Sequence, residues 1–161
     1  MNARRRLLQS LLPLTITACG FRLRGENRWP QDFNPVYIDS DDLTAADRAL
    51  LRSELERAGA RVVDQPENAN RLWLRLNATE PRSIASSSPT AVSLWRIGLR
   101  IDFGLQDAQG RDRVPAQSLN EEASLELDSD NPLTTRSRLE QTQWRLRQGL
   151  LRELVFRLVS R

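Results

Sequence analysis

The feature that most constrains the fold is a two-residue alternation of apolar and polar side chains in residues 71–78 and 94–105. Successive side chains of a β-strand point to opposite faces of its sheet, so each segment predicts a strand with one buried face. The predicted inward set is Leu72, Leu74, Leu76, Ala78, Trp95, Ile97, Leu99, Ile101, Phe103 and Leu105. A fold for this chain must therefore cover one face of a sheet.

Three further strands are predicted around these two. Val36–Asp39 and Arg61–Val63 are short apolar runs, and residues 114–127 form a long segment. Its clearest inward set is Ala123, Leu125 and Leu127. Residues 107–112 predict a hairpin turn, because Gly110 can adopt a positive φ.

Two helices are also predicted. The first spans about residues 44–58, because Thr44 and Asp47 match a capping box and Gly59 suits the left-handed position after a helix. The second runs from Thr134 to about Ser160, where the apolar period becomes helical. Its predicted inward stripe is Trp144, Gln148, Leu150, Leu151, Leu154, Val155, Leu158 and Val159.

The order strand, helix, four strands, helix favours an α+β fold. An antiparallel meander with both helices packed on one face buries all the apolar stripes at once. We expect one domain over residues 36–161 and an extended tether over residues 20–35, which are rich in Arg, Pro and Asn. The Ser- and Pro-rich segment Pro81–Ala91 is expected to form a loop between the alternating strands.

The N-terminus has the layout of a secretory signal. Met1–Arg6 is positively charged, and Leu7–Thr17 is apolar but too short for a hydrocarbon core of about 30 Å. We therefore expect residues 1–18 to be removed as a signal peptide. The alternative is a short N-terminal helix that buries a cysteine.

The sequence Ile-Thr-Ala-Cys, which ends at Cys19, resembles the bacterial lipobox. In such signals the thiol receives a diacylglycerol and the freed amine is acylated too, and three acyl chains anchor a protein firmly. Cys19 is thus the expected lipid attachment site. Gly20 follows it where an aspartate would favour the inner membrane, so the expected location is the periplasmic side of the outer membrane.

Composition excludes several classes of function. The chain has no histidine and one cysteine, which excludes Cys/His zinc sites and Ser-His-Asp or Cys-His catalysis. All 24 basic residues are arginines, and three of them, Arg4–Arg6, lie in the predicted signal peptide. The other 21 arginines balance the charge of the 21 acidic residues. The mature chain then has no global field for nucleic acid. No carboxylate pair suits acid–base chemistry, so we expect neither an enzyme nor a cofactor or metal.

The outward face of the predicted sheet holds the first candidate binding residues. Arginines and an aromatic interleave there, and this pattern suits phosphates, sugars or single strands of nucleic acid. The residues are Arg71, Trp73, Arg75, Arg96 and Arg100. The alternative is a solvated face with ion pairs from arginine to Glu122 and Glu126, although a Trp among charges more often marks a contact surface.

The second candidate is the start of the last helix, where Arg136 and Arg138 follow Asn131-Pro132. Cations at a helix N-terminus interact unfavourably with the helix dipole, so their presence hints at an anionic partner. A solvated helix end is the alternative.

With these features in place, the chain resembles the LPS-assembly lipoprotein family LptE, where LPS is lipopolysaccharide. The resemblance rests on residues 19–24, Cys-Gly-Phe-Arg-Leu-Arg, and on two shorter motifs, Ile38-Asp39-Ser40 and Asp130-Asn131-Pro132. It implies a two-layer sandwich, with two helices on a four-stranded and mostly antiparallel sheet.

The resemblance also implies a function. It implies an outer-membrane lipoprotein that pairs one-to-one with the β-barrel LptD as plug and assembly partner, and that binds LPS without catalysis. Arg138, with Arg136 nearby, falls at one place of the family's LPS contacts; the other place, the loop between the central strands, offers only Arg82 here. The alternatives are an auxiliary subunit of a lipid-transport ABC system and a periplasmic module that binds a ligand by its sheet face.

Overall fold

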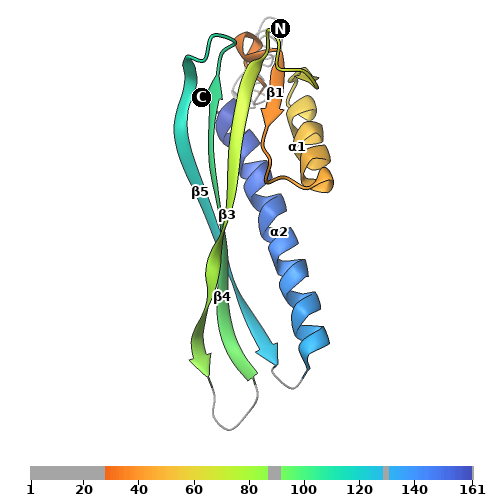
Figure 1. Cartoon of the computed structure of the whole chain (residues 1–161), viewed down its shortest axis with the longest axis vertical. Helices are drawn as coiled ribbons and strands as arrows, with labels where there is room; N and C mark the ends of the chain where they lie inside the picture. The colour runs from red at the N-terminus through yellow and green to blue at the C-terminus, as the bar shows by residue number, and fades with distance from the viewer. Residues whose placement is uncertain (1–27, 87–91, 129–130, 161) are drawn as a thin grey trace, which may run out of the picture.

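The computed structural model describes residues 28–86, 92–128 and 131–160, and the predicted signal peptide, Cys19 and Gly20 lie outside these ranges. Two helices lie beside a long, twisted sheet (Figure 1). The elements are η1 (Gln31–Phe33), β1 (Val36–Asp39), α1 (Ala45–Arg57), β2 (Val62–Val63), β3 (Asn70–Ser86), β4 (Val92–Gln106), β5 (Asp112–Asp128) and α2 (Pro132–Val159). The predicted α+β class with two helices is confirmed.

The sheet has five strands in the order β2-β1-β3-β4-β5, the number that the residue patterns predict, whereas the resemblance to LptE implied four strands in a mostly antiparallel sheet. Strands β3, β4 and β5 are antiparallel, as predicted, but β1 runs parallel to both β2 and β3. The parallel pair follows from the helical connection, because α1 carries the chain from the end of β1 back to its start. The sheet is therefore mixed.

Strand β3 extends further than its alternation predicted. Residues 81–86, expected to lie in a loop, continue the ladder with β4 after a register shift between Thr79 and Arg82. Pro81 lies inside that shift, where a missing backbone donor is tolerated. Apolar alternation ends at Ala78 because the strand no longer covers a core there, while its backbone pairing continues.

The chain joins the fold before β1. Trp29 is 2% exposed, and its backbone N–H donates to the carbonyl of Ala58, just after α1. The rings of Trp29 and Phe33 pack edge to face at 5.9 Å between centroids. The end of the expected tether, from residue 28 onward, is therefore packed against the domain.

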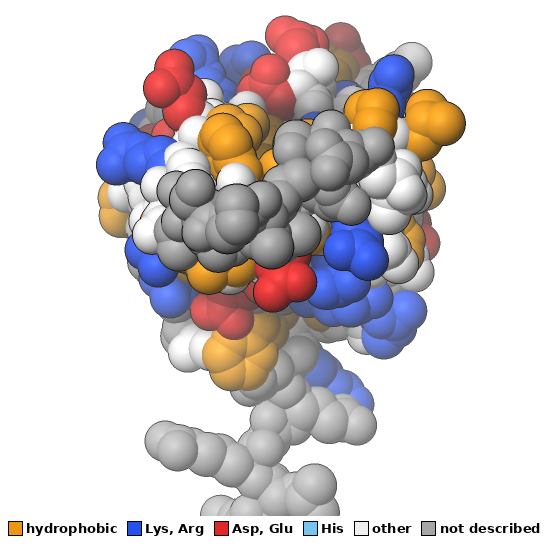
Figure 2. Space-filling model, turned by 90° about the horizontal axis from the view of Figure 1, so that it is seen from below, with side chains coloured by type: hydrophobic (Ala, Val, Ile, Leu, Met, Phe, Trp, Pro, Cys, Tyr) orange, Lys and Arg blue, Asp and Glu red, His pale blue; other side chains and the backbone are white. Residues whose placement is uncertain are grey.

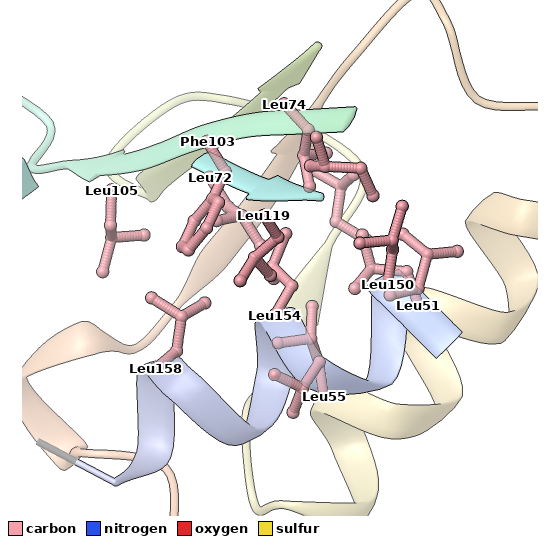
Figure 3. Packing of buried hydrophobic residues seen from close by; sticks show 14 of the residues in the cluster. Leu51, Leu55, Leu72, Leu74, Phe103, Leu105, Leu119, Leu150, Leu154 and Leu158 are labelled. Carbon is pink, nitrogen blue, oxygen red and sulfur yellow. The ribbon is translucent and has the colours of Figure 1, made fainter. Parts of the chain in front are cut away.

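The core lies between the sheet and the two helices (Figure 3). The predicted inward residues Leu72, Leu74 and Phe103 are buried, and they meet the α2 leucines that recur every four residues. The buried α2 set is Thr142, Leu146, Leu150, Leu151, Leu154, Val155 and Leu158. Trp144 was wrongly placed in this stripe: it is 54% exposed, because Leu146, two residues on and about 200° around the helix, faces the sheet instead.

A buried carboxylate joins the two helices. Thr44 caps α1: its hydroxyl accepts from the backbone N–H of Asp47, and the side chain of Asp47 accepts from the backbone N–H of Thr44, as the predicted capping box requires. The same Asp47 oxygen accepts from Nη1 of Arg147 in α2 at 3.0 Å. Asp47 is 4% exposed, so this ion pair is largely shielded from water.

Neither of the helices that the structure describes is both long and apolar enough to cross a membrane.

Replacing Asp47 by alanine should lower the free energy of unfolding by about 2–4 kcal/mol, because it removes a helix cap and leaves Arg147 without its partner. Asp64→Ala is the matched control, since Asp64 pairs with Arg52 at the surface and should cost below about 1 kcal/mol. Urea unfolding measures both. Equal losses of unfolding free energy in the two variants would contradict the role of Asp47 in holding α1 and α2 together.

Candidate functional site

The helices cover one face of the sheet, so the outward residues of β3 and β4 form the other. Register places Trp73 opposite Gly104 and Arg75 opposite Asp102 on that face. The indole of Trp73 lies over Gly104, where an added Cβ would meet three ring atoms at 2.8 Å. Gly104 is therefore needed for the close approach of the ring, and Trp73 is only partly exposed.

A groove of about 880 Å³ opens on this face beside Trp73. Its lining comes from the outward side of β3 and β4 and from the turn that follows β1. The turn contributes Ser40, Asp41 and Asp42, and the sheet contributes Arg71, Trp73 and Arg75 among others. The parallel pairing of β1 with β3 brings the turn to the groove.

Most charged groups of the groove are already paired. Arg71 binds Asp39 at 2.6 Å, and Arg100 binds Asp102 at 2.8 Å. The carboxylate of Asp42 accepts from the backbone N–H of Leu76 at 3.1 Å. Within the part of the chain that the structure describes, Arg75 has no ion-pair partner.

Asp102 is the centre of a small hydrogen-bond network. The hydroxyl of Ser118 and the side chains of Arg100 and Asn77 donate to its carboxylate. The hydrogen bond from Ser118 is the main cause that holds the pKa of Asp102 below its ordinary value of 3.8, and Arg100 adds to it while burial opposes it. Asp102 is therefore an ionised acceptor at neutral pH.

The five predicted contact residues share one face, but they do not form one cluster. Arg71, Trp73 and Arg75 line the groove, and Arg100 touches it through Asp102. Arg96 lies further along the sheet, opposite Arg82, and pairs with Glu122 at 3.7 Å. Arg96 therefore fits the alternative interpretation of the sequence, in which the arginines of this face form solvated ion pairs.

The start of α2 forms a second candidate site at the far end of the molecule. Asn131 caps the helix, and Arg136 pairs with Glu140 at 3.0 Å on the surface. Leu133 nearby is 82% exposed. Figure 2, seen from this end, shows arginine side chains beside exposed hydrophobic ones.

Arg138 borders a hollow of about 460 Å³ between α2 and the sheet. Ala123 and Leu125 supply an apolar side to this hollow, and Arg145 stands two helical turns from Arg138. Neither guanidinium has an ion-pair partner among the described residues. Sequence reasoning missed Arg145, although its spacing of seven from Arg138 could have placed both on one face.

The described residues include no group of three or more His, Cys, Asp or Glu side chains placed to hold a metal ion.

No protein-family model matches the chain. Over 105 residues, 63% of this chain, it is 27% identical to the "LPS-assembly lipoprotein LptE" of Yersinia enterocolitica. The match covers 48% of that protein, so the chain spans about half the length of the curated relative. The predicted resemblance to LptE is confirmed.

Solved lipoprotein structures share the fold. An uncharacterized lipoprotein B from Nitrosomonas europaea has a TM-score of 0.62 at 20% identity and covers 84% of this chain and 88% of its own. A minor lipoprotein from Acinetobacter baumannii has a TM-score of 0.53 at 16% identity, and the match covers 81% of this chain and 91% of that protein. Rare lipoprotein B from Shewanella oneidensis has a TM-score of 0.50 at 16% identity, and the match covers 79% of this chain and 92% of that protein. At these identities the likeness concerns the fold alone.

Gly104→Ala should destabilise the fold by about 1–3 kcal/mol, because the new methyl group meets the Trp73 ring, which must leave its place. Gly149→Ala in α2 is the comparison. Its methyl group meets only the end of the flexible Glu121 side chain, so a better helix former should be neutral or stabilise by up to about 1 kcal/mol. Denaturant unfolding decides; a Gly104 variant as stable as the Gly149 variant would refute the packing argument.

Ser118→Ala should raise the pKa of Asp102 towards 3.8, because the main hydrogen bond to the carboxylate is lost. The folded-state pKa lies below the unfolded one, so the stability from Asp102 is present above pH 3.8 and disappears as the pH falls through the lowered value. A carboxyl ¹³C NMR titration reports this pKa. Ser124→Ala, on the same face but opposite Arg96, should leave it unchanged.

Proposed function

We propose that this chain is an outer-membrane lipoprotein that acts in LPS assembly. The observation that carries the proposal is the match to LptE over 63% of the chain. The lipobox that ends at Cys19 supports a lipid anchor, and Gly20 supports the outer membrane as its location. The shared lipoprotein fold agrees with this assignment.

The finer proposal is that the protein pairs one-to-one with the β-barrel LptD, as plug and assembly partner. The described chain begins at the end of the molecule where α2 ends, and the start of α2 lies at the other end (Figure 1). A helix of 28 residues is about 42 Å long, so a lipid anchor on Cys19 leaves the start of α2 free to reach away from the anchored end.

The start of α2 is the proposed contact for LPS. No described residue pairs with the guanidinium groups of Arg138 and Arg145, so both can donate paired hydrogen bonds to a phosphate, and an arginine fork matches phosphate oxygens closely. Ala123 and Leu125 beside them offer apolar surface to an acyl chain. Arg136, two residues before Arg138, is a further cation of this helix end and pairs with Glu140. This chemistry is binding and positioning, and no bond is made or broken.

The partner is tested by purification of the full lipidated protein in mild detergent. A large, heat-modifiable β-barrel protein should be retained in equal amount. Retention of an inner-membrane ATPase complex would favour the auxiliary subunit of an ABC system, and either that result or no partner at all would overturn the pairing with LptD.

LPS binding is tested with the double variant Arg136→Ala, Arg138→Ala. Its affinity for purified LPS should fall about tenfold or more, because two cations that could neutralise phosphates are lost. The matched control is Arg152→Ala, Arg157→Ala at the other end of the same helix, where each arginine pairs with a glutamate. Both double variants should remain folded. Equal affinity in the two would remove Arg136 and Arg138 from the site.

A further inference from the structure

We infer that the groove beside Trp73 is a binding site for an uncharged saccharide. The inference rests on the indole, on the free polar groups around it and on the charge balance of the lining. It does not depend on the proposed LPS contacts, because Trp73 lies on the sheet face that the helices leave open, while Arg138 lies between α2 and the other face.

Trp73 provides a stacking surface that is fixed in place. Its ring covers Gly104, so one side of the indole is held against the sheet while the side chain stays partly exposed. The C–H groups of one face of a pyranose carry slight positive charge, and the face of an aromatic ring carries negative charge. A sugar ring can therefore pack flat on the indole without loss of rotational freedom in the side chain.

Groups that could bind hydroxyls surround the indole. No described residue accepts a hydrogen bond from the indole N–H of Trp73, and Arg75 has no partner either, so both remain donors. Asp41 lies in the turn after β1 on one side of Trp73, and the ionised Asp102 lies on β4 on the other side, so an acceptor is present on both sides of the indole. A sugar hydroxyl both donates and accepts, so it can satisfy the two kinds of group at once.

The charge balance selects against an anionic ligand. The lining contains four aspartates, Asp39, Asp41, Asp42 and Asp102, against only Arg71 and Arg75. A phosphate would meet this excess of negative charge, whereas a hydroxyl donates to a carboxylate in a strong, charge-assisted hydrogen bond. The groove is thus suited to neutral sugars.

Two glycans of the periplasm carry neutral sugar rings, the core oligosaccharide of LPS and the glycan chain of peptidoglycan. The probes are therefore a core oligosaccharide free of lipid, phosphate and acidic sugars, and a trisaccharide of N-acetylglucosamine. Each is titrated into the full lipidated protein in detergent micelles, and the indole N–H resonances of its four tryptophans are followed by NMR.

The Trp73 resonance should shift with at least one probe, and the probe that binds identifies the source of the sugar. Trp73→Ala should weaken binding about tenfold or more, and Arg75→Gln and Asp41→Asn several-fold, through the loss of stacking and of hydrogen bonds. Trp144→Ala and Arg82→Gln are matched controls and should bind as the unmodified protein does. Arg75→Gln and Asp41→Asn change exposed side chains, so they keep the test valid if Trp73→Ala fails to fold.

Several results would overturn the inference. These are no shift of Trp73 with either probe, equal affinity in the Trp73→Ala and Trp144→Ala variants, or tighter binding of a phosphorylated oligosaccharide than of its dephosphorylated form. Protection of Trp73 by a co-purified protein without any saccharide binding would assign the groove to a protein contact instead. Loss of LPS binding in the Arg136→Ala, Arg138→Ala variant has no bearing on these outcomes.

Discussion

The packing of α2 against the sheet is the interaction on which the other elements depend. Leu146, Leu150, Leu154 and Leu158 are all buried, and each such side chain contributes about 1.5–3 kcal/mol when it leaves water. The long hairpins of β3, β4 and β5 could not remain folded with this face exposed, since isolated β-hairpins are marginal in water. Helix α2 also holds α1, through the ion pair between Arg147 and Asp47.

The predictions that succeeded are those in which backbone geometry alone sets the outcome. Alternation placed Ile97, Leu99 and Phe103 on the buried face, because side chains of a strand must alternate. The capping box of Thr44 was also confirmed, since it depends on residues three apart. The prediction that Trp144 is buried was wrong because the apolar character of a residue does not by itself show which side of a helix is buried. The extent of β3 was wrong because β4 supplies hydrogen bonds whatever the side chains are.

The candidate sites were harder to predict than the fold. Alternation placed Arg71, Trp73 and Arg75 on one face correctly, but the groove also needs the turn at Asp41. That turn reaches Trp73 only because β1 runs parallel to β3, and the expected antiparallel sheet has no such pairing. Arg145 was missed for a related reason, since the hollow that it borders exists only where α2 meets Ala123 and Leu125.

A chain with a formal net charge of only +3 can still present two surfaces of opposite electrostatic character. The groove beside Trp73 carries more aspartates than arginines, while Arg138 and Arg145, which have no ion-pair partner among the described residues, lie by the other face of the sheet. Layers of a fold lie about 10 Å apart, and salt screens exposed charges over about 8 Å under physiological conditions. The two surfaces therefore act on ligands almost independently, and a small net charge does not cancel either of them. A ligand with anionic groups and a ligand with neutral sugar rings would thus be drawn to different faces of the same molecule.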